Sequence, residues 1–140
     1  AVEEALHVKR VPLDELLRTA DVVTLHVPLN RHTKAMISDR EFDLMQPTAV
    51  LINACRGPVV DEAALIRAIK GKKIMAAGLD VLEEEPTPAD NPLLDMDNVL
   101  ITPHLAAFAQ ESYEKSRTFA VQNTARVALG EEPESVVEPV

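Results

Sequence analysis

Short apolar runs alternate with segments of helical periodicity along most of the chain. Four such runs, rich in Val, Ile, Leu and Ala, lie at residues 22–27, 49–53, 74–80 and 99–102. Runs that are apolar at nearly every position are typical of strands buried on both faces of a parallel sheet. Their alternation with helical segments predicts an α/β fold, with helices on both faces of the sheet.

Helix signals lie between the predicted strands. A leucine stripe after Pro12 predicts a short first helix, and Ser38 with Glu41 forms a capping box before a second. Asp61 is placed to cap a third helix, which Gly71 ends. A long helix is predicted over residues 109–129 and an acidic tail over residues 131–140, and the sequence also suggests a short strand at residues 8–11.

Three polar residues follow the predicted strands: Arg56, Glu85 and His104. The carboxyl ends of parallel strands meet at one rim, where open α/β sheets bind their ligands. An arginine can hold a substrate carboxylate with its planar fork, a histidine can protonate a carbonyl oxygen, and a glutamate favours the protonated histidine. These residues suit carbonyl reduction, although each alone could equally be a solvated charge or a turn residue.

Composition argues against several classes of partner. The chain of 140 residues is 46% hydrophobic and carries a formal net charge of −9, which repels nucleic-acid phosphates and anionic lipids. Cys55 is the single cysteine, so an internal disulfide and a cysteine-rich zinc site are excluded, as expected in the cytoplasm. His26, His32, Cys55 and His104 lack the close spacing of metal ligands, and we expect no metal site.

Three segments have a more specific pattern: N-A-C-R-G-P-V-V-D-E-A-A-L at 53–65, A-A-G-L-D-V-L-E-E-E-P at 76–86 and I-T-P-H-L-A at 101–106. Together they resemble the D-isomer-specific 2-hydroxyacid dehydrogenases, over about residues 11–130. The resemblance implies that Arg56 holds the substrate carboxylate, that His104 is the catalytic acid/base, and that Glu85 is the partner of His104.

The resemblance also implies which residues contact the cofactor: Val27, Pro28, Cys55, Arg56, Asp80, His104 and Ala106. In the family pattern the 27–28 backbone passes the adenosine side, Cys55 faces the nicotinamide ribose, and Asp80 binds the carboxamide. Asp80 could alternatively cap nearby backbone N–H groups, and the Cys55 sulfur is expected to be ordinary buried packing. Many relatives have glycine soon after the histidine, whereas this chain has Leu-Ala-Ala-Phe at 105–108.

The dinucleotide-binding glycine pattern G-x-G-x-x-G does not occur in the sequence, which has only four glycines. We therefore expect an incomplete Rossmann-like parallel sheet without the first βαβ half. Residues 1–130 are expected to form the C-terminal part of a dinucleotide-binding domain, and residues 131–140 its acidic tail.

The resemblance implies hydride transfer between a nicotinamide cofactor and a D-2-hydroxy acid/2-keto acid pair, in a cytoplasmic homodimer. The cofactor is expected to be NAD, with NADP open, because the group that selects between them would precede Ala1. The isolated chain is expected to be inactive. A nicotinamide-sensing binding module, like corepressors related to this family, is the alternative function.

Overall fold

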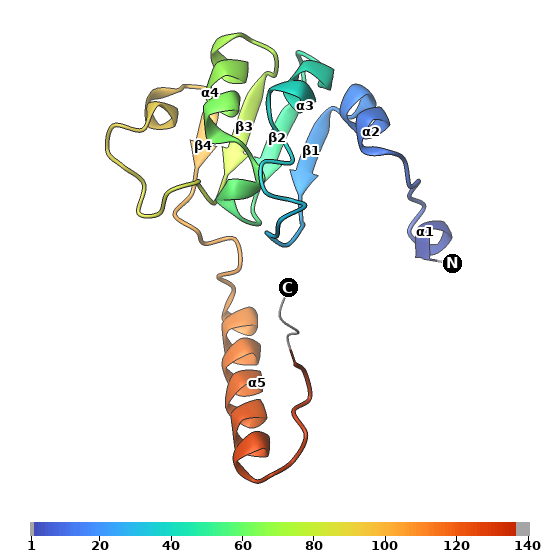
Figure 1. Ribbon diagram of the computed structural model, residues 1–140, viewed down its shortest axis with the longest axis vertical. Helices are drawn as coiled ribbons and strands as arrows, with labels where there is room; N and C mark the ends of the chain where they lie inside the picture. Colours follow the sequence, from blue (N-terminus) through green and yellow to red (C-terminus); the bar gives the residue numbers. More distant parts are fainter. Residues whose placement is uncertain (1, 137–140) are drawn as a thin grey trace. The chain divides into compact units, whose positions relative to one another are not determined.

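The protein is described here by a computed structural model over residues 2–136 (Figure 1). The chain divides after Pro103 into two compact units, and each is described by itself.

The first unit contains a four-stranded parallel sheet. Its strands are β1 (Val22–Leu25), β2 (Val50–Asn53), β3 (Ala76–Leu79) and β4 (Val99–Ile101), and they lie side by side in chain order. The register pairs Val22 with Val50 and Val50 with Ala76. All four predicted strands and their parallel pairing are therefore confirmed.

The predicted helices of the first unit are also present. They are α2 (Leu13–Thr19), α3 (Asp39–Leu44) and α4 (Glu62–Lys70). The Ser38 backbone N–H donates to Glu41 Oε2 at 3.1 Å, as the capping box requires, and Asp61 Oδ1 accepts from the Ala64 N–H at 2.9 Å. Gly71 follows α4 as its C-cap. These local patterns therefore marked the helix starts correctly.

Some short elements differ from the sequence prediction. The 3₁₀ helices η1 (Gly57–Val59) and η2 (Pro92–Asp95) and the short helix α1 (Val2–Ala5) were not predicted. Residues 8–11 form no strand, so that suggestion was wrong. These residues join α1 to α2 and have mostly exposed side chains. They are not paired with any strand of the described sheet.

The predicted fold class, a Rossmann-like α/β parallel sheet with helices, is confirmed. Within the first unit, burial of the sheet is one-sided, whereas strands covered on both faces were predicted. Leu51 of β2 has an exposed fraction of 0%, whereas Val22 and Leu100, on the other face of the sheet, are 53% and 70% exposed. Strands that follow one another in order through right-handed crossovers place every connection on the same face. Helices reach the second face of such a sheet only where the strand order reverses.

Ion pairs join the helices on the covered face. The Arg67 guanidinium donates to both Asp39 oxygens at 3.1 and 2.6 Å, linking α4 to α3, and Arg40 Nη2 donates to Asp14 Oδ2 at 2.6 Å, linking α3 to α2. The hydrogen bond from Arg67 holds the pKa of Asp39 below its ordinary value, and Arg40 lowers the pKa of Asp14 in the same way.

The second unit consists mainly of α5 (Gln110–Ala128), which confirms the predicted helix over 109–129. Part of the predicted acidic tail is hydrogen-bonded to this helix. Asn123 Oδ1 accepts from the Glu134 N–H at 2.7 Å, and Arg126 Nε donates to the Glu132 carbonyl at 2.9 Å. Residues 137–140 of that tail lie outside the described residues. None of the helices in residues 2–136 has the length and apolar character needed to cross a membrane.

Candidate functional site

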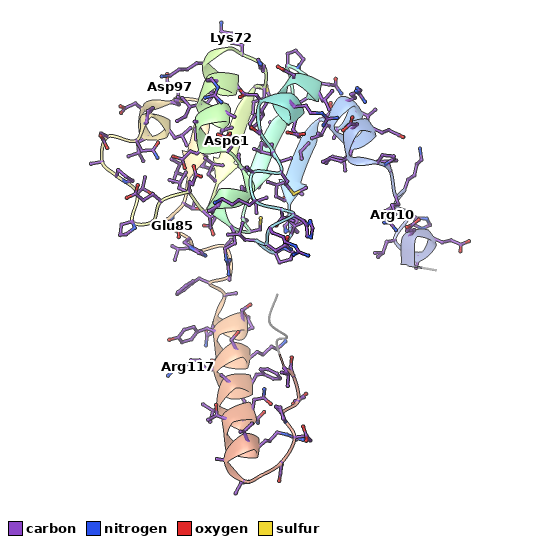
Figure 2. The ribbon with its side chains drawn as sticks, viewed as in Figure 1. Arg10, Asp61, Lys72, Glu85, Asp97 and Arg117 are labelled. Atoms are coloured by element: carbon purple, nitrogen blue, oxygen red, sulfur yellow. The ribbon has the colours of Figure 1, made fainter. Side chains whose placement is uncertain are left out.

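The carboxyl ends of β1–β4 form a rim in which successive strands remain in register. Beyond the last paired residues, the Asp80 N–H donates to the Asn53 carbonyl and the Thr102 N–H donates to the Leu79 carbonyl, both at 2.9 Å. Glu85 lies near the end of the sheet toward which the β1 arrow points in Figure 1, and Lys72 lies at the opposite end (Figure 2). The sheet therefore brings the turn of Arg56, the loop of Glu85 and Asp80 to one rim.

The turn that carries Arg56 is fixed by a buried amide at the end of β2. Asn53 has an exposed fraction of 1%, and its Nδ2 donates to the Arg56 carbonyl at 3.0 Å. Its Oδ1 accepts from the Cys55 N–H at 3.2 Å and from Cys55 Sγ at 3.1 Å. One side chain thus holds both ends of the turn, while the Arg56 side chain is exposed and donates to the Cys55 carbonyl at 2.6 Å.

Gly57 brings this turn against the loop that follows β3. A Cβ atom at Gly57 would lie 1.8 Å from the Leu82 carbonyl oxygen and 2.6 Å from the Glu83 nitrogen, so only glycine fits. Leu82 in turn donates its N–H to Glu85 Oε1 at 3.2 Å. The backbone beside Arg56 is therefore in direct contact with the segment that holds the Glu85 carboxylate.

Asp80 is a nearly buried carboxylate at the end of β3. Its exposed fraction is 8%, and Thr102 Oγ1 donates to its Oδ1 at 2.5 Å. Thr102 follows β4, so neighbouring strands together position this carboxylate. A carboxylate held in this way is an acceptor for an amide or hydroxyl donor.

The turn after β1, with Val27 and Pro28, is held by hydrogen bonds of its own. Thr33 Oγ1 donates to the Pro28 carbonyl at 2.6 Å and accepts from the Asn30 N–H at 2.9 Å. Asn30 Oδ1 also accepts from the His32 N–H at 2.8 Å. The backbone of this turn is therefore fixed beside the rim.

His104 and Ala106 belong to the second unit, so their position relative to the rim is not part of the described geometry. The backbone of His104 is in the left-handed region with φ of 55°. Histidine is among the non-glycine residues enriched in that region, and residues held there cluster at functional sites. The pairing of His104 with Glu85 remains a prediction.

The described rim suits part of a nicotinamide dinucleotide. Asp80 supplies an acceptor for an amide, and the turns after β1 and β2 offer fixed backbone groups beside it. A glycine-rich turn for the diphosphate does not occur in the sequence. The residues present therefore fit the nicotinamide and adenosine contacts but not the diphosphate contact. Among residues 2–136 no group of three or more His, Cys, Asp or Glu could hold a metal ion.

Sequence reasoning missed the residues that hold the rim together: Asn53, Gly57, Glu62, Asn91 and Thr102. Asn53 and Thr102 had a detectable signal, because each is a polar residue at the end of an apolar run. Gly57, Glu62 and Asn91 act through partners 21 to 29 positions away in the sequence, such as Glu83 for Glu62 and Glu62 for Asn91. No local pattern indicates such contacts.

Comparisons with known proteins agree with this geometry. The family model described as "D-isomer specific 2-hydroxyacid dehydrogenase, NAD binding domain" matches residues 1–106. A glyoxylate reductase of Korarchaeum cryptofilum is 42% identical over 135 residues, which cover 96% of this chain and 41% of that protein. The chain therefore spans less than half the length of this curated relative.

Solved structures give the same result. The D-lactate dehydrogenase of Lactobacillus jensenii, crystallised with NAD⁺, matches with a TM-score of 0.88 and 36% identity, covering 99% of this chain and 46% of that chain. A D-isomer specific 2-hydroxyacid dehydrogenase of Xanthobacter autotrophicus, in complex with NADPH and MES, matches with a TM-score of 0.79 and 39% identity, covering 91% and 52% respectively. The parallel sheet, its strand-end rim and these matches establish that the chain belongs to the D-isomer specific 2-hydroxyacid dehydrogenase family and is homologous to its NAD-binding domain.

Proposed function

We propose that this chain is the later part of the nucleotide-binding domain of an NAD(P)-dependent dehydrogenase. Its reaction would interconvert a 2-keto acid and a D-2-hydroxy acid. In this proposal residues 1–130 are the C-terminal part of the domain, and residues 131–140 are an acidic tail. The observation that carries the proposal is the contact of the Arg56 turn with the Glu85 loop, through Gly57 and Leu82, at the rim of a sheet matched by this family.

The nicotinamide cofactor would supply the hydride when bound. Arg56 would hold the substrate carboxylate through two parallel N–H donors, which orients the keto carbon. His104 would give its proton to the carbonyl oxygen in reduction, and in oxidation it would take the proton from the hydroxyl. An ionised Glu85 beside the imidazole would favour its protonated form.

The cofactor-binding residues in this proposal are those of the rim and the start of the second unit: Val27, Pro28, Cys55, Arg56, Asp80, His104 and Ala106. Asp80, held by Thr102, would accept a hydrogen bond from the carboxamide N–H₂. The turns after β1 and β2 would present backbone groups to the adenosine side and to the nicotinamide ribose.

We further propose a cytoplasmic homodimer that acts on a small acid and does not bind nucleic acid. The net charge of −9 supports the last point, because it opposes binding to phosphate backbones. The single cysteine is in keeping with a reducing compartment.

The test is an assay of the protein that carries this sequence together with the glycine-containing half and the substrate domain. Its oxidation of NADH and NADPH is followed with a panel of 2-keto acids, and the product is separated on a chiral column. The proposal predicts turnover to the D-isomer. An L-product, or tight dinucleotide binding without turnover of any keto acid, would contradict it, and the second result would favour a nicotinamide sensor.

A further inference from the structure

The loop between β3 and η2 carries Glu85 and stands away from the body of the first unit (Figure 1). An open hollow of about 510 Å³ lies against it, lined in part by Glu62, Glu84, Pro88 and Asp90. Glu83, Glu84 and Glu85 are all exposed. The side chains at 83–85 therefore lie outside the core, and hydrogen bonds at the ends of the loop contribute to its position.

Glu62 contacts both ends of this loop through one carboxylate. Its Oε2 accepts from the Glu83 N–H at 2.9 Å, and its Oε1 accepts from Asn91 Nδ2 at 2.7 Å. The second contact continues into buried structure, since Asn91 is 8% exposed and its Oδ1 accepts from the Leu93 N–H at 2.9 Å.

The helix that carries Glu62, α4, is firmly held in the first unit. Glu62 is the first residue of α4, directly after the N-cap Asp61, whose side chain accepts from Ala64 N–H at 2.9 Å and from Ser38 Oγ at 3.0 Å. Ala64 and Leu65 of the same helix are buried in the core. The Glu62 carboxylate therefore links the position of α4 to both ends of this loop.

From this geometry we propose that Glu62 is a positioning residue for Glu85. By fixing Glu83 and Asn91, it sets where the loop places the Glu85 carboxylate, whose Oε1 also accepts from the Leu82 N–H at 3.2 Å. The inference rests on the proposed function, because that proposal gives Glu85 its role beside His104.

The first experiment uses the 140-residue chain and measures amide hydrogen exchange of Glu83 by NMR. Glu62→Ala removes both acceptors, so exchange at Glu83 should become about 10- to 100-fold faster, the change expected for losing a hydrogen bond to a charged group. Glu62→Gln keeps one amide oxygen as an acceptor and should give a smaller change. Asp39→Ala, which breaks the exposed ion pair between α3 and α4 but leaves both acceptors of Glu62 in place, is the control and should leave exchange at Glu83 unchanged.

The second experiment uses the longer dehydrogenase of the proposed function and measures kcat, the KM of the keto acid and the Kd of NADH. Glu62→Ala should lower kcat by about 10- to 100-fold, because a shift of one catalytic group by about 1 Å has effects of that size. The Kd of NADH and the melting temperature should stay close to those of the Asp39→Ala control, and Glu62→Gln should restore part of kcat.

The outcomes separate the two proposals. Unchanged exchange at Glu83 in Glu62→Ala overturns the inference, and so does accelerated exchange with an unchanged kcat in an active enzyme. A loss of kcat that only follows a fall in melting temperature in both Glu62 variants also overturns it, because it indicates a merely structural role. If the wild-type enzyme turns over no keto acid, the proposed function fails, and exchange at Glu83 alone decides whether Glu62 holds the loop.

Discussion

At the scale of single residues, the geometry of the rim depends on the size and hydrogen bonding of residues next to the proposed catalytic groups, as well as on the charges of those groups. Gly57 is an example, since its backbone does not have a positive φ and the requirement for glycine is steric. Asn53 is another, because a buried amide with both donor and acceptor in use is needed to close the turn before Arg56. The polar residues that would touch substrate are thus placed by neighbours that would not.

Replacing Gly57 with Ala should therefore destabilise the protein, by about 1–3 kcal/mol as for an overpacked site, because the new methyl group would meet the Leu82 carbonyl. Urea unfolding of the 140-residue chain measures this change.

The matched control is Gly78→Ala in β3, where the nearest atom to a new Cβ is Ile52 Cγ1 at 3.9 Å, an ordinary contact. This variant should be as stable as the wild type or more so, since glycine weakens the interior of a strand. Equal stability losses in the two variants would show that the contact between Gly57 and Leu82 does not explain the glycine.

Substrate binding is also a residue-scale question. Arg56→Lys should raise the KM of the keto acid in the longer dehydrogenase, because an ammonium group cannot reproduce the bidentate fork of arginine. A variant with wild-type KM would show that Arg56 does not hold the substrate carboxylate.

At the scale of elements, the strands and helices followed from local pattern, whereas their limits and neighbours did not. The apolar run at 22–27 gives a strand that ends at Leu25, and the run at 74–80 gives one that begins at Ala76. Around β3, apolar character continues beyond the strand because Ile74 and Val81 are buried without belonging to the ladder. An apolar run in the sequence indicates which residues are buried. The length of a strand depends on how far the neighbouring strand forms backbone hydrogen bonds with it.

The ion pair between α3 and α4 gives an element-scale prediction about pH. Arg67 lowers the pKa of Asp39 in the folded chain, so the unfolded chain binds more protons near the ordinary aspartate pKa of about 3.9. The stabilising effect should be present above that pH and should be lost as pH falls through the lowered pKa of the folded state.

Melting temperatures of the wild type and Asp39→Asn, measured from neutral to acidic pH, test this expectation. The wild type should be slightly more stable at neutral pH and low salt, and the difference should shrink with added salt and vanish at the acidic end. A difference that grew on acidification would contradict the assigned direction.

At the scale of the whole molecule, the chain combines all three proposed catalytic residues with only part of a cofactor site. Arg56, Glu85 and His104 were all proposed from the sequence, by their places after the strands and by family pattern, while the one-sided covering of the sheet within the first unit was not anticipated. Nearly continuous apolar runs predict burial on both faces, yet Val22 and Leu100 are largely exposed here because the helices of the first unit lie over one face. An apolar pattern indicates that a strand is buried, but it does not indicate which segment of the protein covers each face.

The incomplete cofactor site predicts weak dinucleotide binding by the 140 residues alone. Backbone N–H groups of a glycine-rich turn at a helix N-terminus normally hold the diphosphate, and the sequence lacks that turn. Calorimetric titration with NAD⁺ should therefore give little heat at micromolar concentrations. A micromolar Kd would show that the diphosphate contact is dispensable.

The most direct test of the account is the effect of His104→Gln on kcat in the longer dehydrogenase, measured as the rate of NADH oxidation with a saturating 2-keto acid. Loss of a general acid should lower kcat by about 10²- to 10⁴-fold. A kcat equal to that of the wild-type enzyme would contradict the proposed role of His104 and, with it, the chemistry assigned to the strand-end rim.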